Sequence, residues 1–401
     1  MTRTHYDIVV VGGGIHGAGV AQAAAASGYS VLVLEKSRIA AGTSSRSSKL
    51  IHGGLRYLET GHLALVRESL HERDWLLRNA PALVKKVPFY IPVYQTSRRS
   101  SLKIGLGLSL YAILGGFRES LKFRQISQRR WTALDGLKTE GLDAVYQYWD
   151  AQTDDRALTG AVMHSARSLG ATLLAPARFE EATLEKDGYR ILYHYQESRK
   201  TCLASTLVNA AGPWVHDISS RIQPPIPKIK IDLIQGTHIL LDGPLSQSIY
   251  YLESHRDKRP VFVTPWKGRT LVGTTETVFT GDPDKVEPLE SEKSYLLETL
   301  SFYFPHHRST SMSQIYATFA GLRVLPSGND KPGKRSRETV LMVDDADRPR
   351  CLTIYGGKLT TYRSTAHNVL KRLGKSLPTK TSKADTRRLR LKPVHGDETR
   401  P

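Results

Sequence analysis

Three glycines near the N-terminus have the spacing with which proteins hold a dinucleotide. Gly12, Gly14 and Gly17 follow the apolar run 8–11 in the order G-x-G-x-x-G. Gly12 permits a tight turn, Gly14 lets a pyrophosphate approach the backbone, and Gly17 lets the next helix lie close to the strand. Ile15 opens that helix, and its first N–H groups are predicted to point at the pyrophosphate.

A carboxylate follows the second strand of the same unit. Glu35 comes directly after the apolar run 31–34, about twenty residues beyond the glycines, where it can accept hydrogen bonds from an adenosine ribose. A tight turn without a ligand would explain the glycines but not Glu35. The pattern predicts a dinucleotide-binding βαβ unit and at this point leaves NAD and FAD open.

Glycines recur beside polar groups further along the chain. The small polar stretch 40–49, which could also be a flexible surface loop, runs into 50–58, where two glycines stand near a His, an Arg and a Tyr. An apolar strand enters a turn at Gly212, and another enters the pair at 356–357. Separate glycine turns far from the first are expected of a two-part FAD site, so the sequence favours FAD over NAD.

Composition narrows the choice of partners. The chain has 57 Lys and Arg against 38 Asp and Glu, a net charge of +19, which favours phosphorylated metabolites, nucleic acid or an anionic membrane surface. No basic run is interleaved with aromatics, so nucleic acid is not expected. Cys202 and Cys351 are far apart, so we expect no disulfide framework and no metal site, in a reducing compartment. Neither a secretion signal nor a membrane span is predicted.

The strand and helix signals along the chain predict an α/β protein with a β-rich, α+β second domain. Strand signals recur over 223–337, with one helix near 290–300. The chain then returns to the first domain. The expected organisation is a discontinuous FAD-binding domain at 1–92, 143–222 and 338–376, an insertion at 93–142, a substrate domain at 223–337 and a disordered basic tail at 377–401.

The insertion contains an apolar run, 104–114, that is too short to cross a bilayer. Basic residues precede and follow it: Arg98, Arg99, Lys103, Arg118, Lys122, Arg124, Arg129 and Arg130. An ordinary buried helix and an interfacial helix held by its basic flanks explain this segment equally well.

These segments together resemble the FAD-dependent, quinone-linked glycerol-3-phosphate dehydrogenase family over about residues 5–375. The match includes Val-Gly-Gly-Gly-Ile-His-Gly-Ala-Gly at 11–19 and Asn-Ala-Ala-Gly-Pro-Trp-Val at 209–215. Its most specific part is Thr-Ser-Ser-Arg-Ser-Ser-Lys-Leu-Ile-His-Gly-Gly-Leu-Arg-Tyr-Leu-Glu at 43–59. It departs from the family at Glu276, where members usually carry Asp, and it lacks their usual helical C-terminal domain.

The resemblance implies a glutathione-reductase-type Rossmann domain that binds FAD, with a β-rich substrate domain. It implies oxidation of sn-glycerol 3-phosphate to dihydroxyacetone phosphate by hydride transfer to flavin, with electrons passed to a quinone. The net charge of +19, the basic-flanked segment 104–114 and the need to reach a quinone together predict a cytoplasmic protein bound peripherally to the anionic inner face of the cytoplasmic membrane. A homodimer is left open.

The resemblance also implies the site residues. Arg323 is expected to hold the substrate phosphate with Arg56 or Arg337, and Tyr57 matches an active-site position of the family, where packing would explain it equally well. His238 is the first candidate for the base that takes the hydroxyl proton. Lys358 is the alternative base, or stabilises charge on the flavin or the substrate oxygen. The expected FAD-binding residues are Gly12, Gly14, Ile15, Gly17, Glu35, Thr43, Ser44, Ser45, Ser48, Lys49, Leu50, His52, Gly53, Gly54, Ala211, Gly212, Trp214, Gly357, Lys358, Leu359 and Thr360.

Two other functions remain compatible with these residues. One is a flavin oxidase of the same fold that uses oxygen and acts on a glycerol phosphate or an amine. The other is a non-catalytic FAD-binding protein. Peroxide formation in air without added quinone would identify the oxidase.

Overall fold

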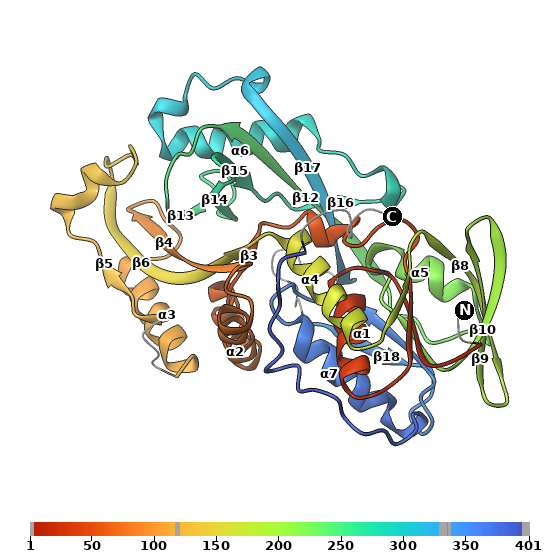
Figure 1. Cartoon of the computed structure of the whole chain (residues 1–401). Coiled ribbons are helices and arrows are strands. Elements are labelled where there is room, and N and C mark those ends of the chain that lie inside the picture. Colours follow the sequence, from red (N-terminus) through yellow and green to blue (C-terminus); the bar gives the residue numbers. More distant parts are fainter. Residues whose placement is uncertain (1–3, 117–120, 329–334, 336–337, 395–401) are drawn as a thin grey trace.

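The computed structural model describes residues 4–116, 121–328, 335 and 338–394. The chain forms two lobes, each built on one sheet (Figure 1). The helices are α1 (Ile15–Ala26), α2 (Leu63–Asn79), α3 (Ser101–Leu114), α4 (Asp155–Ser168), α5 (Val215–Ser220), α6 (Glu290–Tyr303) and α7 (Tyr362–Leu373).

The first lobe contains a sheet of nine strands within the described residues. These are β1 (His5–Val11), β2 (Val31–Leu34), β7 (Thr172–Leu174), β8 (Ala177–Glu185), β9 (Gly188–Tyr195), β10 (Ser198–Asn209), β11 (Ile222–Gln223), β18 (Val340–Val343) and β19 (Cys351–Tyr355). β1 lies between β2 and β10 and is parallel to both, and β19 is parallel to β10. The predicted βαβ unit and the return of the chain to this sheet are therefore confirmed.

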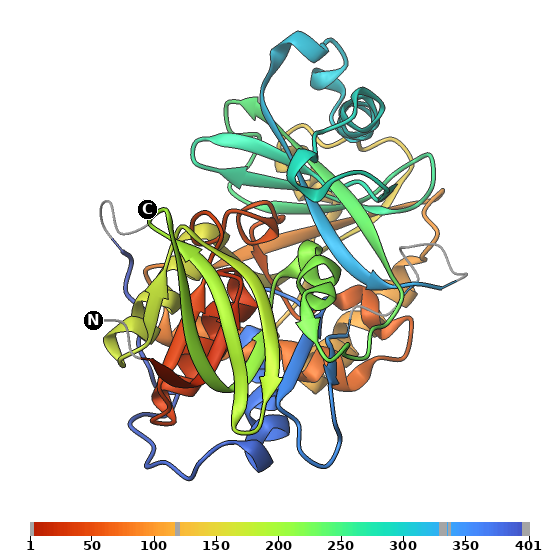
Figure 2. The same ribbon diagram turned by 90° about the vertical axis from the view of Figure 1, so that its right-hand side faces the viewer.

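Both faces of the parallel strands are covered. The alanine-rich helix α1 packs on one face, against α4 and α7. Strands β8, β9 and β10 form an antiparallel meander whose aromatic side chains pack on the other face. Figure 2 shows this yellow-green meander in front of the red β1, with the second lobe above. Burial on both faces explains why β1 and β2 are apolar throughout.

The second lobe contains a sheet of ten strands within the described residues. These are β3 (Leu50–Ile51), β4 (Val84–Tyr94), β5 (Arg124–Gln125), β6 (Leu142–Thr153), β12 (Ile231–Asp242), β13 (Ile249–Glu253), β14 (Pro260–Trp266), β15 (Arg269–Gly273), β16 (Thr277–Phe279) and β17 (Ile315–Pro326). The sequence assigned 1–92 and 143–222 to the first domain. The long β4–β6 pairing instead places both strands in the second sheet, because β4 also pairs with β13.

Helix α3 buries one face of the apolar insertion and exposes the other. Ile104, Leu108 and Tyr111 are buried against the second sheet, whereas Leu106 and Leu102 on the other face are exposed. Among the described residues no helix has the length and apolar character needed to cross a bilayer. Arg99 turns inward and pairs with two carboxylates, so it is not part of the exposed basic flank, and Arg118 lies outside the described residues.

The C-terminal segment differs from the prediction of disorder. The N–H of Leu391 donates to the Asn79 carbonyl, and the N–H of Lys383 donates to the Ala26 carbonyl. The side chain of Leu391 is buried in the core of the first lobe. Backbone hydrogen bonds and one apolar anchor therefore order this segment as far as residue 394, although its sequence has no periodicity. Residues 395–401 lie outside the described residues.

Candidate active site

A cavity of about 1180 Å³ lies between the two lobes. Its floor is formed by the turns that follow β1, β10 and β19, and its other wall comes from β12, β14 and β17. The carboxyl ends of parallel strands are where α/β sheets bind their ligands. The three glycine turns recognised in the sequence therefore meet at one place.

The first glycine turn has the geometry that a pyrophosphate requires. A Cβ atom on Gly17 would stand 1.9 Å from the Gly12 carbonyl oxygen, so this glycine is needed for packing of α1 on β1. Gly14 instead faces the cavity, where its nearest neighbour would be the Ser44 hydroxyl at 3.1 Å. The Ile15 N–H, at the start of α1, points at the same hydroxyl over 2.9 Å. This helix N-terminus lines the cavity, where its dipole favours an anionic ligand.

Glu35 lies beside this turn. Its carboxylate accepts the Gly13 N–H at 2.6 Å and the Ser37 N–H at 2.8 Å. It therefore ties the end of β2 to the glycine turn, at the place where the ribose of a dinucleotide is expected.

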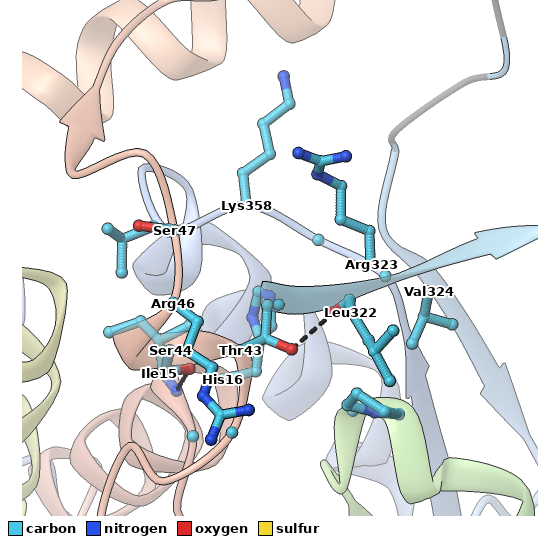
Figure 3. A pocket seen from close by; sticks show the side chains of 18 of the residues that line it. Ile15, His16, Thr43, Ser44, Arg46, Ser47, Leu322, Arg323, Val324 and Lys358 are labelled. Carbon is cyan, nitrogen blue, oxygen red and sulfur yellow. Dashed lines mark hydrogen bonds between the residues drawn. The ribbon is translucent and has the colours of Figure 1, made fainter. Parts of the chain in front are cut away.

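The loop 43–50 crosses from one lobe to the other. The Thr43 hydroxyl donates to the Leu322 carbonyl at 2.6 Å, which anchors the loop on β17 (Figure 3). Lys49 is buried and pairs with Asp155 at 2.7 Å, and it also donates to the Ser45 carbonyl at the same distance. Lys49 and Ser45 do not line the cavity, so their role is to fix the loop.

Most of the residues predicted to bind FAD line the cavity. They are Gly12, Gly14, Ile15, Glu35, Thr43, Ser44, Ser48, Leu50, His52, Gly54, Ala211, Gly212, Trp214, Gly357, Lys358, Leu359 and Thr360. Gly17, Ser45, Lys49 and Gly53 lie behind it. Gly53 donates its N–H to the Tyr111 hydroxyl at 2.8 Å, and a Cβ atom there would be 2.4 Å from that oxygen.

Five of the six predicted catalytic residues line the same cavity: Arg56, Tyr57, His238, Arg323 and Lys358. Arg337 lies outside the described residues. The Lys358 ammonium is 3.8 Å from the centroid of the Tyr57 ring. In Figure 3, Lys358 and Arg323 come from opposite lobes and point toward the same end of the cavity.

His238 is fixed in an unusual environment. Its Nε2 atom is 2.9 Å from the Ser48 hydroxyl, its ring stacks on Phe319, and it is 2% exposed. Gly273 lies opposite on β15, where a Cβ atom would be 2.1 Å from the ring. Burial, and then the positive charges of Arg323 and Lys49, lower the pKa of His238 well below its ordinary value. The imidazole is therefore neutral near pH 7.

The sequence analysis missed several residues of the cavity wall. Tyr251 and Phe262 pair across β13 and β14 and present rings to the cavity, and Arg259 lines it nearby. Alternation along these strands indicates which residues share a face, but not that this face lines a cavity. His16 stood inside the first glycine motif, and burial lowers its pKa to about 4. No group of three or more His, Cys, Asp or Glu side chains that could hold a metal occurs within the described part of the chain.

Comparisons with known proteins identify the family of this chain. The family described as FAD dependent oxidoreductase matches residues 7–363. D-erythritol 1-phosphate dehydrogenase of Brucella abortus is 34% identical over 379 residues, which cover 93% of this chain and 74% of that protein. Aerobic glycerol-3-phosphate dehydrogenase of Staphylococcus aureus is 34% identical over 389 residues, which cover 94% of this chain and 68% of that protein.

Solved structures share the fold. Glycerol-3-phosphate dehydrogenase from Bacillus halodurans, complexed with FAD, superposes with a TM-score of 0.76 at 24% identity, over 98% of this chain and 68% of that one. L-alpha-glycerophosphate oxidase from Mycoplasma pneumoniae, with FAD bound, gives a TM-score of 0.73 at 16% identity. The match covers 96% of this chain and 97% of that one.

The cofactor follows from the site and the family together. The cavity is large enough for a dinucleotide, Gly14 leaves room for a pyrophosphate beside the N-terminus of α1, and Glu35 stands where a ribose is expected. The residues present therefore fit FAD, the cofactor of the matching family. The family match covers residues 7–363, and the two relatives are 34% identical to this chain. The chain therefore belongs to the FAD-dependent oxidoreductases, within the glycerol-3-phosphate dehydrogenase group.

Proposed function

We propose that this protein oxidises sn-glycerol 3-phosphate to dihydroxyacetone phosphate and passes the electrons to a quinone. The observation that carries the proposal is the convergence of Arg323, Lys358 and His238 on one cavity beside the FAD-binding turn. The lobe of the first sheet is proposed to hold the cofactor, and the lobe of the second sheet to hold the substrate. The erythritol 1-phosphate relative supports a four-carbon polyol phosphate as the second candidate substrate.

The proposed roles follow from the chemistry of the side chains. Bound FAD supplies the two-electron acceptor. Arg323 holds the phosphate dianion, because a guanidinium fork matches the geometry of phosphate oxygens. His238, being neutral, accepts the hydroxyl proton of the substrate. Lys358 stabilises negative charge on the substrate oxygen as that proton leaves.

Anaerobic titration tests the function. The purified yellow protein is mixed with glycerol 3-phosphate, erythritol 1-phosphate or glycerol, and bleaching of the visible flavin band is followed. Fast bleaching by glycerol 3-phosphate supports the proposal, and faster bleaching by erythritol 1-phosphate would transfer it to the second candidate. Peroxide formation in air at the rate of turnover would identify an oxidase, and no bleaching by any of these compounds would reject the function.

Replacing Arg323 with alanine is expected to raise KM for glycerol 3-phosphate by about one to two decades. A hydrogen bond to a charged group contributes about 1.5–3 kcal/mol, and each 1.4 kcal/mol is about tenfold in binding. Steady-state kinetics with a quinone analogue measure the effect. Arg269→Ala, at the outer end of the same sheet, is the matched control. An unchanged KM in Arg323→Ala would remove this residue from the phosphate site.

We also propose that α3 contacts the inner face of the cytoplasmic membrane. Leu102, Leu106 and Ile113 expose an apolar face, and Arg98 and Lys103 are exposed at its N-terminal end. A short apolar face of this kind can insert at a lipid surface, and each Lys or Arg near anionic head groups adds about 1 kcal/mol. Such contact would bring the flavin site close to a membrane quinone.

Liposome flotation is expected to give different results for substitutions on the exposed and on the buried face of α3. Leu106 is 63% exposed, so Leu106→Asp should weaken binding to anionic vesicles without loss of folding. Leu108 is 1% exposed, so Leu108→Asp should destabilise the fold itself. Leu203→Asp, at an exposed leucine of the other lobe, is the control and should bind as wild type. Wild-type flotation by Leu106→Asp would contradict the membrane contact.

A further inference from the structure

A buried carboxylate lies directly behind the substrate wall of the cavity. Glu292, in the first turn of α6, is 4% exposed and does not line the cavity. Its Oε2 atom accepts from the Gln235 amide at 2.6 Å and from the Thr237 hydroxyl at 2.5 Å. Its Oε1 atom accepts from the hydroxyls of Thr275 and Thr277, both at 2.7 Å.

The residues that Glu292 contacts alternate with residues of the cavity. Along β12, Gln235 and Thr237 face Glu292, whereas Gly236 and His238 line the cavity. The turn after β15 repeats this pattern, because Thr275 faces Glu292 and its neighbours Thr274 and Glu276 line the cavity. Successive side chains of an extended chain point to opposite sides. Glu292 therefore holds two adjacent segments of the substrate wall from behind.

The same turn contacts Arg323. Thr274 accepts a hydrogen bond from Nη2 of Arg323 at 3.0 Å, and the Thr275 carbonyl accepts one from Nη1 at 3.3 Å. Gly236 makes room for this contact, since a Cβ atom there would lie 2.6 Å from Nη2 of Arg323. The Thr237 N–H donates to the Thr275 hydroxyl at 2.8 Å and links the turn to β12. The orientation of the guanidinium thus depends on a turn that Glu292 fixes.

The contacts of Glu292 require an ionised carboxylate. Burial alone would raise its pKa, but hydrogen bonds from Thr237, Thr277, Thr275 and Gln235 outweigh burial and lower it below the ordinary value. All four of these partners donate to the carboxylate, and hydrogen bonds to an ionised acceptor are the stronger ones. An amide in its place has no charge and only one acceptor oxygen, so the hydroxyl groups that face its NH₂ group would have to turn and accept, and the turn would be held less firmly.

We propose that Glu292 is a positioning residue that sets the orientation of Arg323 for the substrate phosphate. The inference rests on the proposed function, since it takes Arg323 as the phosphate ligand. Glu292 touches neither substrate nor cofactor, and it acts through the turn 274–275. Loss of its charge should impair phosphate binding and leave cofactor binding intact.

Glu292→Gln tests the proposal through the split between KM and kcat. KM for glycerol 3-phosphate is expected to rise about tenfold, the loss of one hydrogen bond to a charged group, with kcat and the FAD spectrum unchanged. Glu290→Gln, an exposed glutamate two residues earlier on the same helix, is the matched control and should keep the wild-type KM. If Glu292→Gln fails to fold, Thr275→Val removes the link while keeping the carboxylate, and the same rise in KM is expected.

A double-mutant cycle with Arg323→Ala separates positioning from a general loss of structure. The rise in KM caused by Glu292→Gln should disappear in the Arg323→Ala background, because no guanidinium remains to be oriented. The proposal would be overturned if the double variant showed the product of the two separate rises in KM. An unchanged KM in Glu292→Gln would overturn it as well. A wild-type enzyme that oxidises no polyol phosphate would instead reject the proposed function.

Discussion

Gly14→Val is expected to give a folded protein that has lost FAD. A Cβ atom on Gly14 would make a tight contact with the Ser44 hydroxyl, at 3.1 Å, and with no backbone atom, so a small shift of one side chain is expected to keep the turn folded. The isopropyl group would occupy the space beside the Ile15 N–H where the pyrophosphate binds. Far-UV circular dichroism should remain that of wild type, while the visible flavin absorption and all flavin-dependent turnover disappear.

Two other glycines serve as references for this result. Gly17→Val should prevent folding, because its Cβ atom would be 1.9 Å from the Gly12 carbonyl oxygen. Gly107→Val, on α3, has nothing within 4 Å and should retain FAD. A yellow Gly14→Val protein with one FAD per chain would place the pyrophosphate elsewhere.

His238→Ala is expected to slow flavin reduction by glycerol 3-phosphate by about two to four decades, the usual contribution of a general base. FAD should stay bound, because the substitution leaves the glycine turns and the contact of Glu35 with the first of them unchanged. Stopped-flow mixing under anaerobic conditions measures the step without the electron acceptor. Wild-type rates in His238→Ala would assign the proton to Lys358, and Lys358→Met would then show the loss.

The pH dependence of wild type should carry the signature of His238. Because its pKa in the folded protein lies well below 6.5, the imidazole stays neutral as pH falls through 6.5, and the rate of flavin reduction should not drop there on its account. The unfolded chain does take up a proton at this histidine near pH 6.5. Above pH 6.5 the ring is neutral in both states, and its protonation does not affect the free energy of unfolding. As pH falls from 6.5 toward the lower pKa of the folded state, only the unfolded chain takes up the proton, so the free energy of unfolding declines.

The dinucleotide-binding turn was the part of the site that could be predicted most directly from the sequence. Gly12, Gly14 and Gly17 have fixed roles in a local turn, and Glu35 follows at a fixed distance, so residues close in sequence were enough. His238, Arg323 and Lys358 are scattered over more than a hundred residues, and only the family resemblance connected them. Their meeting depends on strand pairing between distant segments.

Three features could not be predicted from the sequence because they too depend on pairing between distant segments. The assignment of β4 and β6 to the second sheet depends on their partners, because both strands contain the apolar runs that either sheet would accept. Tyr251 and Phe262 enter the cavity through the register of β13 on β14. Glu292 is one of several charges in its helix, and its partners come from β12 and from residues 275–277, which only the fold brings to it.

The interleaving of the two lobes has a consequence for how the chain becomes folded. β1 pairs with β10 only after β2 to β9 have been made, and β10 gains β19 only after the whole second lobe has emerged. Pairing between such distant segments forms slowly, because closing the long intervening loop lowers the conformational entropy of the chain before the contacts are made. The glycine turn at 356–357 therefore joins the other two last during synthesis. A nascent chain that ends before β19 leaves the edge of β10 unpaired, and such edges promote aggregation.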